Sequence, residues 1–304
     1  MHGNYGPNVL TNECDVLIAV GMRFDDRVTG RLDKYAKQAK VIHLDIDPSE
    51  IDKNVKADVG VWGDCKETLP LLTLGIEQKD RSEWLKVFAS YTQQEYDQCI
   101  KEEIYPATDE MTMGEVIRLV NETTLGNAVM VTDVGQHQMV TCRYAKFNES
   151  RSNVTSGGLG TMGFGLPAAI GAKFGAQDRT VIAVIGDGGI QMTIQELGTI
   201  MQTGVEVKIM ILNNQFLGMV RQWQQLFNDK RYSFVDIQSP DYVMVAKAYG
   251  IEGAKISHRH ELEAGIKTML AHKGSYLLEV MVGKENNVFP MVPQGCSVSE
   301  IRLK

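Results

Sequence analysis

The most regular pattern of apolar and polar positions lies between Val181 and Asn214. An unbroken apolar run at residues 181–185, β-branched except at Ala183, is typical of a strand buried on both faces of a parallel sheet. The next four residues, GDGG, contain too much glycine to extend this strand, and a helix is predicted to follow and to end at Gly204. A second buried strand at residues 207–212 stops at Asn213, so the pattern predicts a βαβ unit. The apolar positions predicted on one side of its helix are Met192, Leu197, Ile200 and Met201.

Polar residues close both strands of this unit. Because the crossover between parallel strands is right-handed, both strand ends lie at the same edge of the sheet. Asp187 and Asn214 should therefore face each other there, although 27 positions separate them. A carboxylate and an amide oxygen suit Mg²⁺, which completes its coordination with water and phosphate oxygens. The glycines Gly186, Gly188 and Gly189 would let a phosphate approach the backbone and the helix N-terminus. The alternative is an Asp-Gly turn with an Asn cap.

Strands and helices alternate through the rest of residues 111–304, which predicts one complete α/β domain with a parallel sheet. Helices are expected at 113–125, from 136, at 166–174, 242–249 and 261–271, and strands at 128–132, 153–156, 254–256 and 276–282. Gln136 and His137 open a helix just beyond a strand, where they would either donate to a phosphate or cap the helix. The stretch 158–163 matches GxGxxG, but no convincing apolar strand precedes it, so it is read as a glycine loop rather than a dinucleotide site.

Residues 1–76 are interpreted as part of a second doubly wound α/β domain, and residues 77–110 as a linker helix. Strands are predicted at 14–20, 40–47 and 59–63, and buried aromatic positions in the linker at Trp84, Phe88, Tyr91 and Tyr96. In open α/β sheets ligands bind beyond the carboxyl ends of the strands. Arg23 could pair there with a phosphate and Asp45 could bind hydroxyl groups, or both could belong to a surface ion-pair network.

The segment that follows Asn214 is predicted to be helical. Met219 and Trp223 lie four positions apart and would share one face of this helix. Such a pair is usually part of a core. Because the segment leaves the predicted metal site directly, the pair could instead line a substrate pocket.

Composition narrows the function classes. The chain has 304 residues and a net charge of -7, with no cluster of lysine or arginine, which argues against a nucleic-acid partner. It contains no run of apolar residues long enough to span a membrane. Its five cysteines are scattered without a CxxC pair, which favours reduced thiols and a cytoplasmic location.

Several segments together resemble one family. They are residues 22–30 (MRFDDRVTG), 135–139 (GQHQM), 157–171, the GDG and NN pair, 218–223 (GMVRQW) and 290–293 (PMVP). The GDG and NN pair resembles the signature of thiamine diphosphate enzymes, and the whole set is similar to the large catalytic subunit of acetohydroxyacid synthase, the biosynthetic acetolactate synthase. The resemblance is continuous over essentially the whole chain, which looks like the C-terminal portion of that subunit.

This resemblance implies three cofactors, namely thiamine diphosphate, Mg²⁺ and FAD. It implies that Asp187 and Asn214 bind Mg²⁺ through their side chains and Phe216 through its carbonyl group, although the family often has another residue at position 216. The remaining implied contacts are Gln136 and His137 with the diphosphate, Gly160 and Met162 with the aminopyrimidine ring, Met219 and Trp223 with substrate, and segments containing His2, Arg23, Asp45 and Asp64 with FAD.

The implied reaction is decarboxylation of pyruvate and joining of its two-carbon fragment to pyruvate or 2-ketobutyrate. The products would be 2-acetolactate and 2-aceto-2-hydroxybutyrate, early in the synthesis of valine, leucine and isoleucine. A homodimer or homotetramer and a small regulatory subunit are further expectations. The alternatives are another thiamine diphosphate enzyme, of the pyruvate oxidase, glyoxylate carboligase or catabolic acetolactate synthase type, or a non-catalytic module that binds the coenzyme and metal.

The chain begins on a glycine-rich loop with no complete βα unit before it. In the family that it resembles, the glutamate that activates the coenzyme lies in an N-terminal domain, so no catalytic residue is expected within this chain. We therefore expect the isolated chain to be inactive or nearly so.

Overall fold

The structure is a computed structural model that describes residues 3–304, and the chain forms two compact units. The first contains the residues up to Lys101 together with Phe289–Lys304, and the second contains Glu102–Val288. Every strand pairing within the two sheets is parallel, which confirms the predicted α/β class. None of the helices in the described part of the chain has the length and apolar character needed to cross a membrane.

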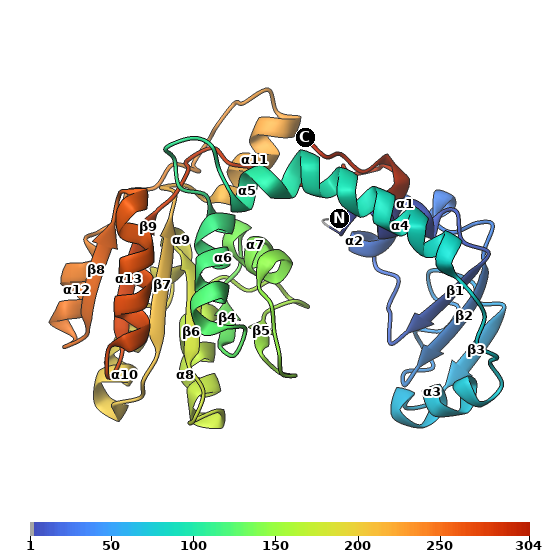
Figure 1. Cartoon of the computed structure of the whole chain (residues 1–304), viewed down its shortest axis with the longest axis horizontal. Helices are drawn as coiled ribbons and strands as arrows, with labels where there is room; N and C mark the ends of the chain where they lie inside the picture. The colour runs from blue at the N-terminus through green and yellow to red at the C-terminus, as the bar shows by residue number, and fades with distance from the viewer. Residues whose placement is uncertain (1–2) are drawn as a thin grey trace. The chain divides into compact units, whose positions relative to one another are not determined.

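The second unit is built on a six-stranded parallel sheet with the order β5-β4-β6-β7-β9-β8 (Figure 1). Its strands are β4 (Val129–Thr132), β5 (Asn153–Thr155), β6 (Val181–Gly186), β7 (Lys208–Asn213), β8 (Glu252–Ile256) and β9 (Tyr276–Met281). All residues of the central strands β6 and β7 are buried, as their apolar sequences predict. The strand predictions for this unit are therefore confirmed to within two residues at each end.

Helices cover both faces of this sheet. They are α6 (Met113–Thr124), α7 (Gln136–Tyr144), α8 (Gly165–Gly175), α9 (Asp187–Ile190), η3 (Ile194–Glu196), α10 (Leu197–Thr203), α11 (Gly218–Phe227), α12 (Tyr242–Ala248) and α13 (Arg259–Ala271). One apolar core lies between the sheet and α6, α7 and α13. A second core packs α8, α10 and α12 against the opposite face. The two cores make this a doubly wound sheet, as predicted.

The connection between β6 and β7 is more broken than its sequence pattern predicts. It contains the short helix α9, the 3₁₀ turn η3 and then α10, which ends at Gly204 with a left-handed backbone (φ 67°). Leu197 and Ile200 are buried as predicted, but Met192 and Met201 are 52% and 60% exposed. The predicted apolar face assumed one continuous helix, and the break at η3 changes which side chains share a face.

The first unit contains a three-stranded parallel sheet with the order β1-β2-β3. Its strands are β1 (Val16–Val20), β2 (Lys40–Asp45) and β3 (Val59–Trp62), as predicted to within about two residues. Its helices are α1 (Tyr5–Thr11), α2 (Asp26–Thr29), η1 (Leu32–Lys34), α3 (Cys65–Leu74), α4 (Ser82–Glu95) and the π-helical turn η2 (Tyr96–Ile100), and η4 (Val298–Glu300) lies near the C-terminus. The helix α5 (Lys101–Ile104) lies at the division between the units.

The structure divides the chain differently from the predicted bounds 1–76, 77–110 and 111–304. Residues 289–304, predicted in the C-terminal domain, pack with the first unit. Gly30 and Ser297 form an antiparallel bridge, and Val298 is buried in a core with Phe24 and Ala19. The tail contains no periodic pattern, so its sequence did not indicate which core it enters.

The predicted linker helix also differs in its buried face. Trp84 is exposed and Phe88, Tyr91 and Tyr96 are only half-buried, whereas Glu95 is the buried residue of α4. The carboxylate of Glu95 accepts a hydrogen bond from the backbone N–H of Tyr5 at 2.6 Å. Of the predicted aromatic positions, Tyr91 packs edge-to-face against Tyr5 with ring centroids 5.0 Å apart, whereas the fully buried position of the helix is the polar Glu95.

Candidate functional site

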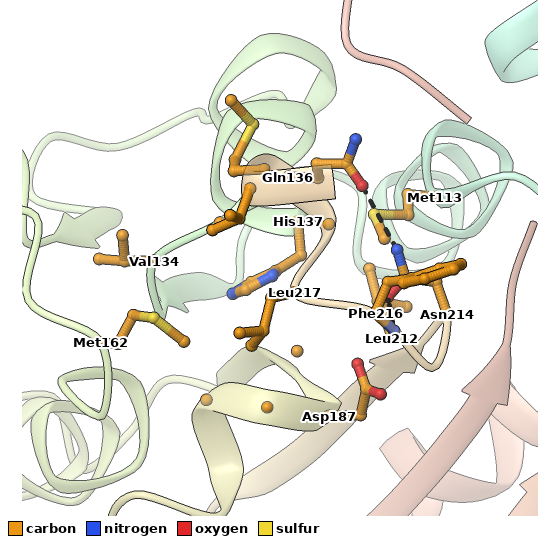
Figure 2. Close-up of a pocket in the computed structure, with 17 residues that line it drawn as sticks. Met113, Val134, Gln136, His137, Met162, Asp187, Leu212, Asn214, Phe216 and Leu217 are labelled. Atoms are coloured by element: carbon orange, nitrogen blue, oxygen red, sulfur yellow. Dashed lines mark hydrogen bonds between the residues drawn. The ribbon is translucent and has the colours of Figure 1, made fainter. Parts of the chain in front are cut away.

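A cavity lies at the carboxyl ends of β4, β6 and β7 in the second unit. The predicted metal ligands Asp187, Asn214 and Phe216 all line it, and so do Gln136 and His137 (Figure 2). The other lining residues are Met113, Val134, Gly135, Met162, Gly186, Gly188, Gly189, Leu212, Leu217, Gly218, Met219 and Val220. The predicted meeting of Asp187 and Asn214 at one sheet edge is thus observed.

Asp187 follows β6 directly, and its carboxylate points toward Asn214 in Figure 2. The side chain is buried, and this burial raises the pKa of Asp187 to about 6. Hydrogen bonds from its own backbone, from the Ser239 hydroxyl and from the N–H groups of Gln215 and Asn214 lower the pKa by less than burial raises it. The Ser239 hydroxyl lies 3.3 Å from Oδ2 of Asp187. The hydroxyl of Tyr242 donates to the Asp187 carbonyl at 2.6 Å and so fixes the backbone. A buried carboxylate without a cationic partner at the site is a suitable ligand for a metal ion.

The turn after β7 places Asn214 and Phe216 in the cavity. The side-chain oxygen of Asn214 accepts from the backbone N–H of Phe216 at 3.2 Å, and its amide donates to Gln136 at 3.3 Å. Gln215 adopts a left-handed conformation with φ 58°. The oxygen of Asn214 therefore remains in the cavity, because both ends of its side chain are held.

His137 is a buried imidazole whose Nε2 atom has no hydrogen-bond partner among the described residues. Burial lowers the pKa of His137 to about 4, so the ring is neutral near pH 7. A Cβ atom on Gly186 would lie 2.9 Å from Nδ1 of this ring, and one on Gly135 would lie 2.9 Å from Cε1. The first glycine of GDGG is therefore required by the close approach of His137 to the end of β6.

Asp133 organises the glycine loop and was not predicted as a site residue. Its carboxylate is buried at the end of β4 and accepts from the backbone N–H of Val134 at 2.7 Å and of Gly163 at 2.9 Å. A Cβ atom on Gly189 would come within 3.0 Å of the carboxyl carbon and overlap one oxygen. Asp133 thus connects the glycine loop, which carries Met162, to the last glycine of GDGG.

Gln222 belongs to the motif 218–223 but was not predicted as a site residue. Its side chain accepts from the amide of Gln136 at 2.9 Å and from the N–H of Val288 at 2.9 Å, and it donates to the Val288 carbonyl at 3.1 Å. The Gln136 amide also donates to the carbonyl of Asn286 at 2.9 Å. This network fixes Gln136 at the cavity, and the signals in the sequence were the motif 218–223 and the position of Gln222 one helical turn beyond Gly218.

The remaining predicted contacts divide between the cavity and its surroundings. Met162 and Met219 line the cavity, whereas Gly160 lies on the exposed part of the glycine loop with φ 63°. Trp223 lies on α11 with Met219, as predicted, but it is outside the cavity lining. Its ring packs against Phe227 with a centroid separation of 4.8 Å.

The residues predicted to contact FAD lie in the first unit, apart from His2, which is outside the described residues. Arg23, Asp45 and Asp64 each stand at or after the carboxyl end of one strand of the three-stranded sheet. Arg23 is largely exposed and pairs with Asp25 at 3.0 Å. Asp45 is buried and accepts from its neighbour Asp47, and Asp64 caps α3 by accepting from Lys66. The ion pair of the alternative interpretation is therefore present at Arg23.

The second-unit cavity fits a metal-bound diphosphate. No group of three or more metal-binding His, Cys, Asp or Glu side chains occurs anywhere in the described part of the chain. A cation at Asp187 would thus need amide, carbonyl and non-protein oxygens, and Asn214, Phe216 and a phosphate group can supply these. The free Nε2 of His137 lies in the same cavity and could donate to such a phosphate.

Comparison with known proteins identifies the family. Residues 133–280 match the family model described as thiamine pyrophosphate enzyme, C-terminal TPP binding domain, and residues 1–72 match the central domain of the same enzymes. The chain belongs to the thiamine pyrophosphate enzyme family. The matched C-terminal region contains Asp187, Asn214, Gln136 and His137.

Proteins similar to this chain along essentially its whole length are acetolactate synthases, among them several large subunits. The Escherichia coli isozyme 2 large subunit is 42% identical over 305 residues, covering 100% of this chain and 54% of the relative. Acetolactate synthase 1 of Nicotiana tabacum is 41% identical and the Lactococcus lactis large subunit 40% identical, with 46% and 52% of those proteins covered. The chain thus spans about half the length of these curated relatives. The resemblance seen in the sequence is confirmed.

Proposed function

We propose that the protein carrying this chain is an acetolactate synthase. It would decarboxylate pyruvate and join the two-carbon fragment to a second 2-ketoacid, either pyruvate or 2-ketobutyrate, in branched-chain amino-acid synthesis. The observation that carries this proposal is the meeting of Asp187, Asn214 and the unpartnered Nε2 of His137 in one cavity. The similarity to acetolactate synthase large subunits then selects this reaction among those of the thiamine pyrophosphate enzymes.

The metal would be held by oxygen atoms from both strand ends. Asp187 and Asn214 would bind Mg²⁺ through their side chains, and Phe216 through its main-chain carbonyl, for which the identity of the side chain matters little. Because the pKa of Asp187 is raised to about 6, its carboxylate is mostly ionised at neutral pH and available to the metal. Below that pH protons would compete with the metal for this oxygen.

His137 and Gln136 would hold the diphosphate. A neutral imidazole can donate from Nε2 to a phosphate oxygen while its Nδ1 atom remains close to Gly186. Gln136 would contribute from the same helix, held in place by Gln222. These contacts bind and orient the coenzyme.

When bound, thiamine diphosphate supplies the electron sink that lets a 2-ketoacid lose CO₂ and form a new carbon–carbon bond. The chain would position this chemistry through its glycine loop. Met162 and Gly160 would meet the aminopyrimidine part of the coenzyme, and Asp133 keeps the loop at the end of β4. Met219 would line the substrate side of the cavity, and Trp223, one turn further along α11, would contribute to specificity.

The first unit would contact FAD. Arg23, Asp45 and Asp64 lie at the carboxyl edge of its sheet, which is where ligands of open α/β sheets bind. A homodimer or homotetramer with a small regulatory subunit would be the assembled form, and a cytoplasmic location is consistent with the five free cysteines.

The test is acetolactate formation from pyruvate with thiamine diphosphate, Mg²⁺ and FAD, comparing the complete protein that carries this chain with its Asp187→Asn variant. At limiting Mg²⁺ the variant should lose activity on the order of 100-fold, as expected when a metal site is damaged. Asp229→Asn makes the same charge change at an exposed side chain and should leave the activity unchanged. Coenzyme binding without acetolactate would instead favour a non-catalytic module, and acetate as the sole product would favour a pyruvate oxidase.

A further inference from the structure

Asn213 stands beside the proposed metal ligand Asn214, and its side chain connects two neighbouring strands. Its side-chain oxygen accepts from the backbone N–H of Gln215 at 3.0 Å, which closes a turn after β7. Its amide group donates to Oε1 of Glu279 on β9 at 2.7 Å. Asn213 and Glu279 are both 1% exposed. The Asn213 side chain therefore connects the buried Glu279 carboxylate, by hydrogen bonds, to the turn that carries Asn214.

This turn needs external support. We call residues 213–216 the metal loop. Gln215 lies in its centre with φ 58°, a left-handed conformation that is unfavourable for a residue with a Cβ atom. Asn214 and Phe216 both line the cavity from this loop, and the side-chain oxygen of Asn214 accepts from the Phe216 N–H. A small rotation of the Asn213 amide would release the N–H of Gln215 and change the position of both proposed ligands.

Glu279 is an unexpected residue at the centre of an apolar strand. Its neighbours Leu277 and Leu278 are buried in the two opposite cores, yet Glu279 places a carboxylate inside the sheet. Lys255 on β8 lies 3.2 Å from Oε1 and is about half exposed, and Oε2 has no hydrogen-bond partner among the described residues. A partly satisfied buried carboxylate reduces stability, so its contact with Asn213 suggests a functional reason for its presence.

We propose that Glu279 is a positioning residue for the metal loop. By accepting from the Asn213 amide it holds that side chain in the orientation that closes the turn, and so sets the affinity of Asn214 and Phe216 for the divalent cation. Lys255 supplies the opposite charge that keeps the Glu279 carboxylate in place. This inference rests on the proposed function, because it concerns the same metal site.

The experiment is calorimetric titration of Mg²⁺ into the protein with thiamine diphosphate present at a fixed concentration, a readout that does not depend on turnover. The unmodified protein is measured first. Absence of Mg²⁺-dependent coenzyme binding there would contradict the proposed function and this inference together. If it binds, the variants test Glu279 alone.

Glu279→Ala should weaken Mg²⁺ binding by about ten-fold or more, corresponding to ~1.4 kcal/mol. Glu279→Gln retains an oxygen acceptor for Asn213 and should restore most of the affinity, and it also serves if the alanine variant does not fold. Leu278→Ala is the matched control. It removes an equally buried side chain from the preceding position of β9, on the opposite face of the sheet. This variant should destabilise the fold without changing the affinity for Mg²⁺.

A double variant tests whether Glu279 acts through Asn213. In an Asn213→Ala background, Glu279→Ala should cause no further loss of Mg²⁺ affinity, because the connection is already broken. Fully additive losses, unchanged affinity in Glu279→Ala, or an equal loss in Leu278→Ala would each overturn the proposal.

Discussion

Gly189 and Asp133 provide a sharp test of how the cavity is built. Replacing Gly189 with Ala would place a Cβ atom 3.0 Å from the Asp133 carboxyl carbon and 3.5 Å from Cγ2 of Ile185. The buried carboxylate of Asp133 accepts hydrogen bonds from the N–H groups of Val134 and Gly163, so it cannot move without losing them. The substitution therefore acts on the glycine loop as well as on local packing.

The expected magnitude follows from these two effects. Overpacking a dense interior costs about 1–3 kcal/mol, and loss of a hydrogen bond to a charged group costs about 1.5–3 kcal/mol. Because the side chains can relax, the two should not add fully, and we expect Gly189→Ala to lower the free energy of unfolding by about 2–4 kcal/mol. Thiamine diphosphate binding should weaken as well, because the loop that carries Met162 loses its attachment to β4.

Urea denaturation measures the loss of stability, and hydrogen exchange at the Gly163 amide reports the detached loop. Gly171→Ala is the matched control, because a Cβ atom there meets nothing within 4 Å and the position is an exposed one inside α8. It should leave exchange at Gly163 unchanged and raise stability by up to about 1 kcal/mol. If Gly189→Ala were as stable as the unmodified protein, with normal exchange at Gly163, the role given to Asp133 would be wrong.

Three further predictions concern stability outside the cavity, all measured by urea denaturation. Burial raises the pKa of Glu103 to about 7 despite the N–H of Gly114, so its stabilising contribution is present below the unfolded pKa near 4.5 and is lost as pH rises through 7. Glu103→Gln should be more stable than the unmodified protein at pH 8 by about 1–3 kcal/mol, with little difference at pH 5. If the two proteins had the same stability at pH 8 as well as at pH 5, this prediction would be wrong. Leu125 ends α6 with φ 53°, so Leu125→Gly should stabilise by about 1 kcal/mol, and a loss would show that its side chain packs favourably. Lys208 is buried and its ammonium group donates to two carbonyls at 2.6 Å, so Lys208→Met should cost about 1–3 kcal/mol, and no change would mean that water replaces these contacts.

The sequence predicted the parts of the molecule that depend on local pattern. The two buried strands around GDGG and the position of Asp187 and Asn214 at one sheet edge followed from β-branched runs and from the geometry of a parallel crossover. These features are predictable because a strand buried on both faces is predominantly apolar, and the polar residues that follow the apolar run mark its end.

The remaining parts depend on contacts between distant segments. Asp133 and Gln222 are ordinary polar residues in the sequence, and they become site residues only because Gly163 and Val288 reach them across the fold. Glu95 likewise became buried through a contact with Tyr5, 90 positions away. Neither residue spacing nor composition contains such pairings, so they could not be predicted from one sequence.

The most direct test of the account is calorimetry of thiamine diphosphate binding with and without Mg²⁺, on the unmodified protein and on Asn214→Ala. We expect binding that requires the metal and is lost in the variant, because one of the three proposed metal ligands is removed. Equal binding without Mg²⁺, or unchanged binding in Asn214→Ala, would show that the cavity at the ends of β6 and β7 is not a metal–diphosphate site.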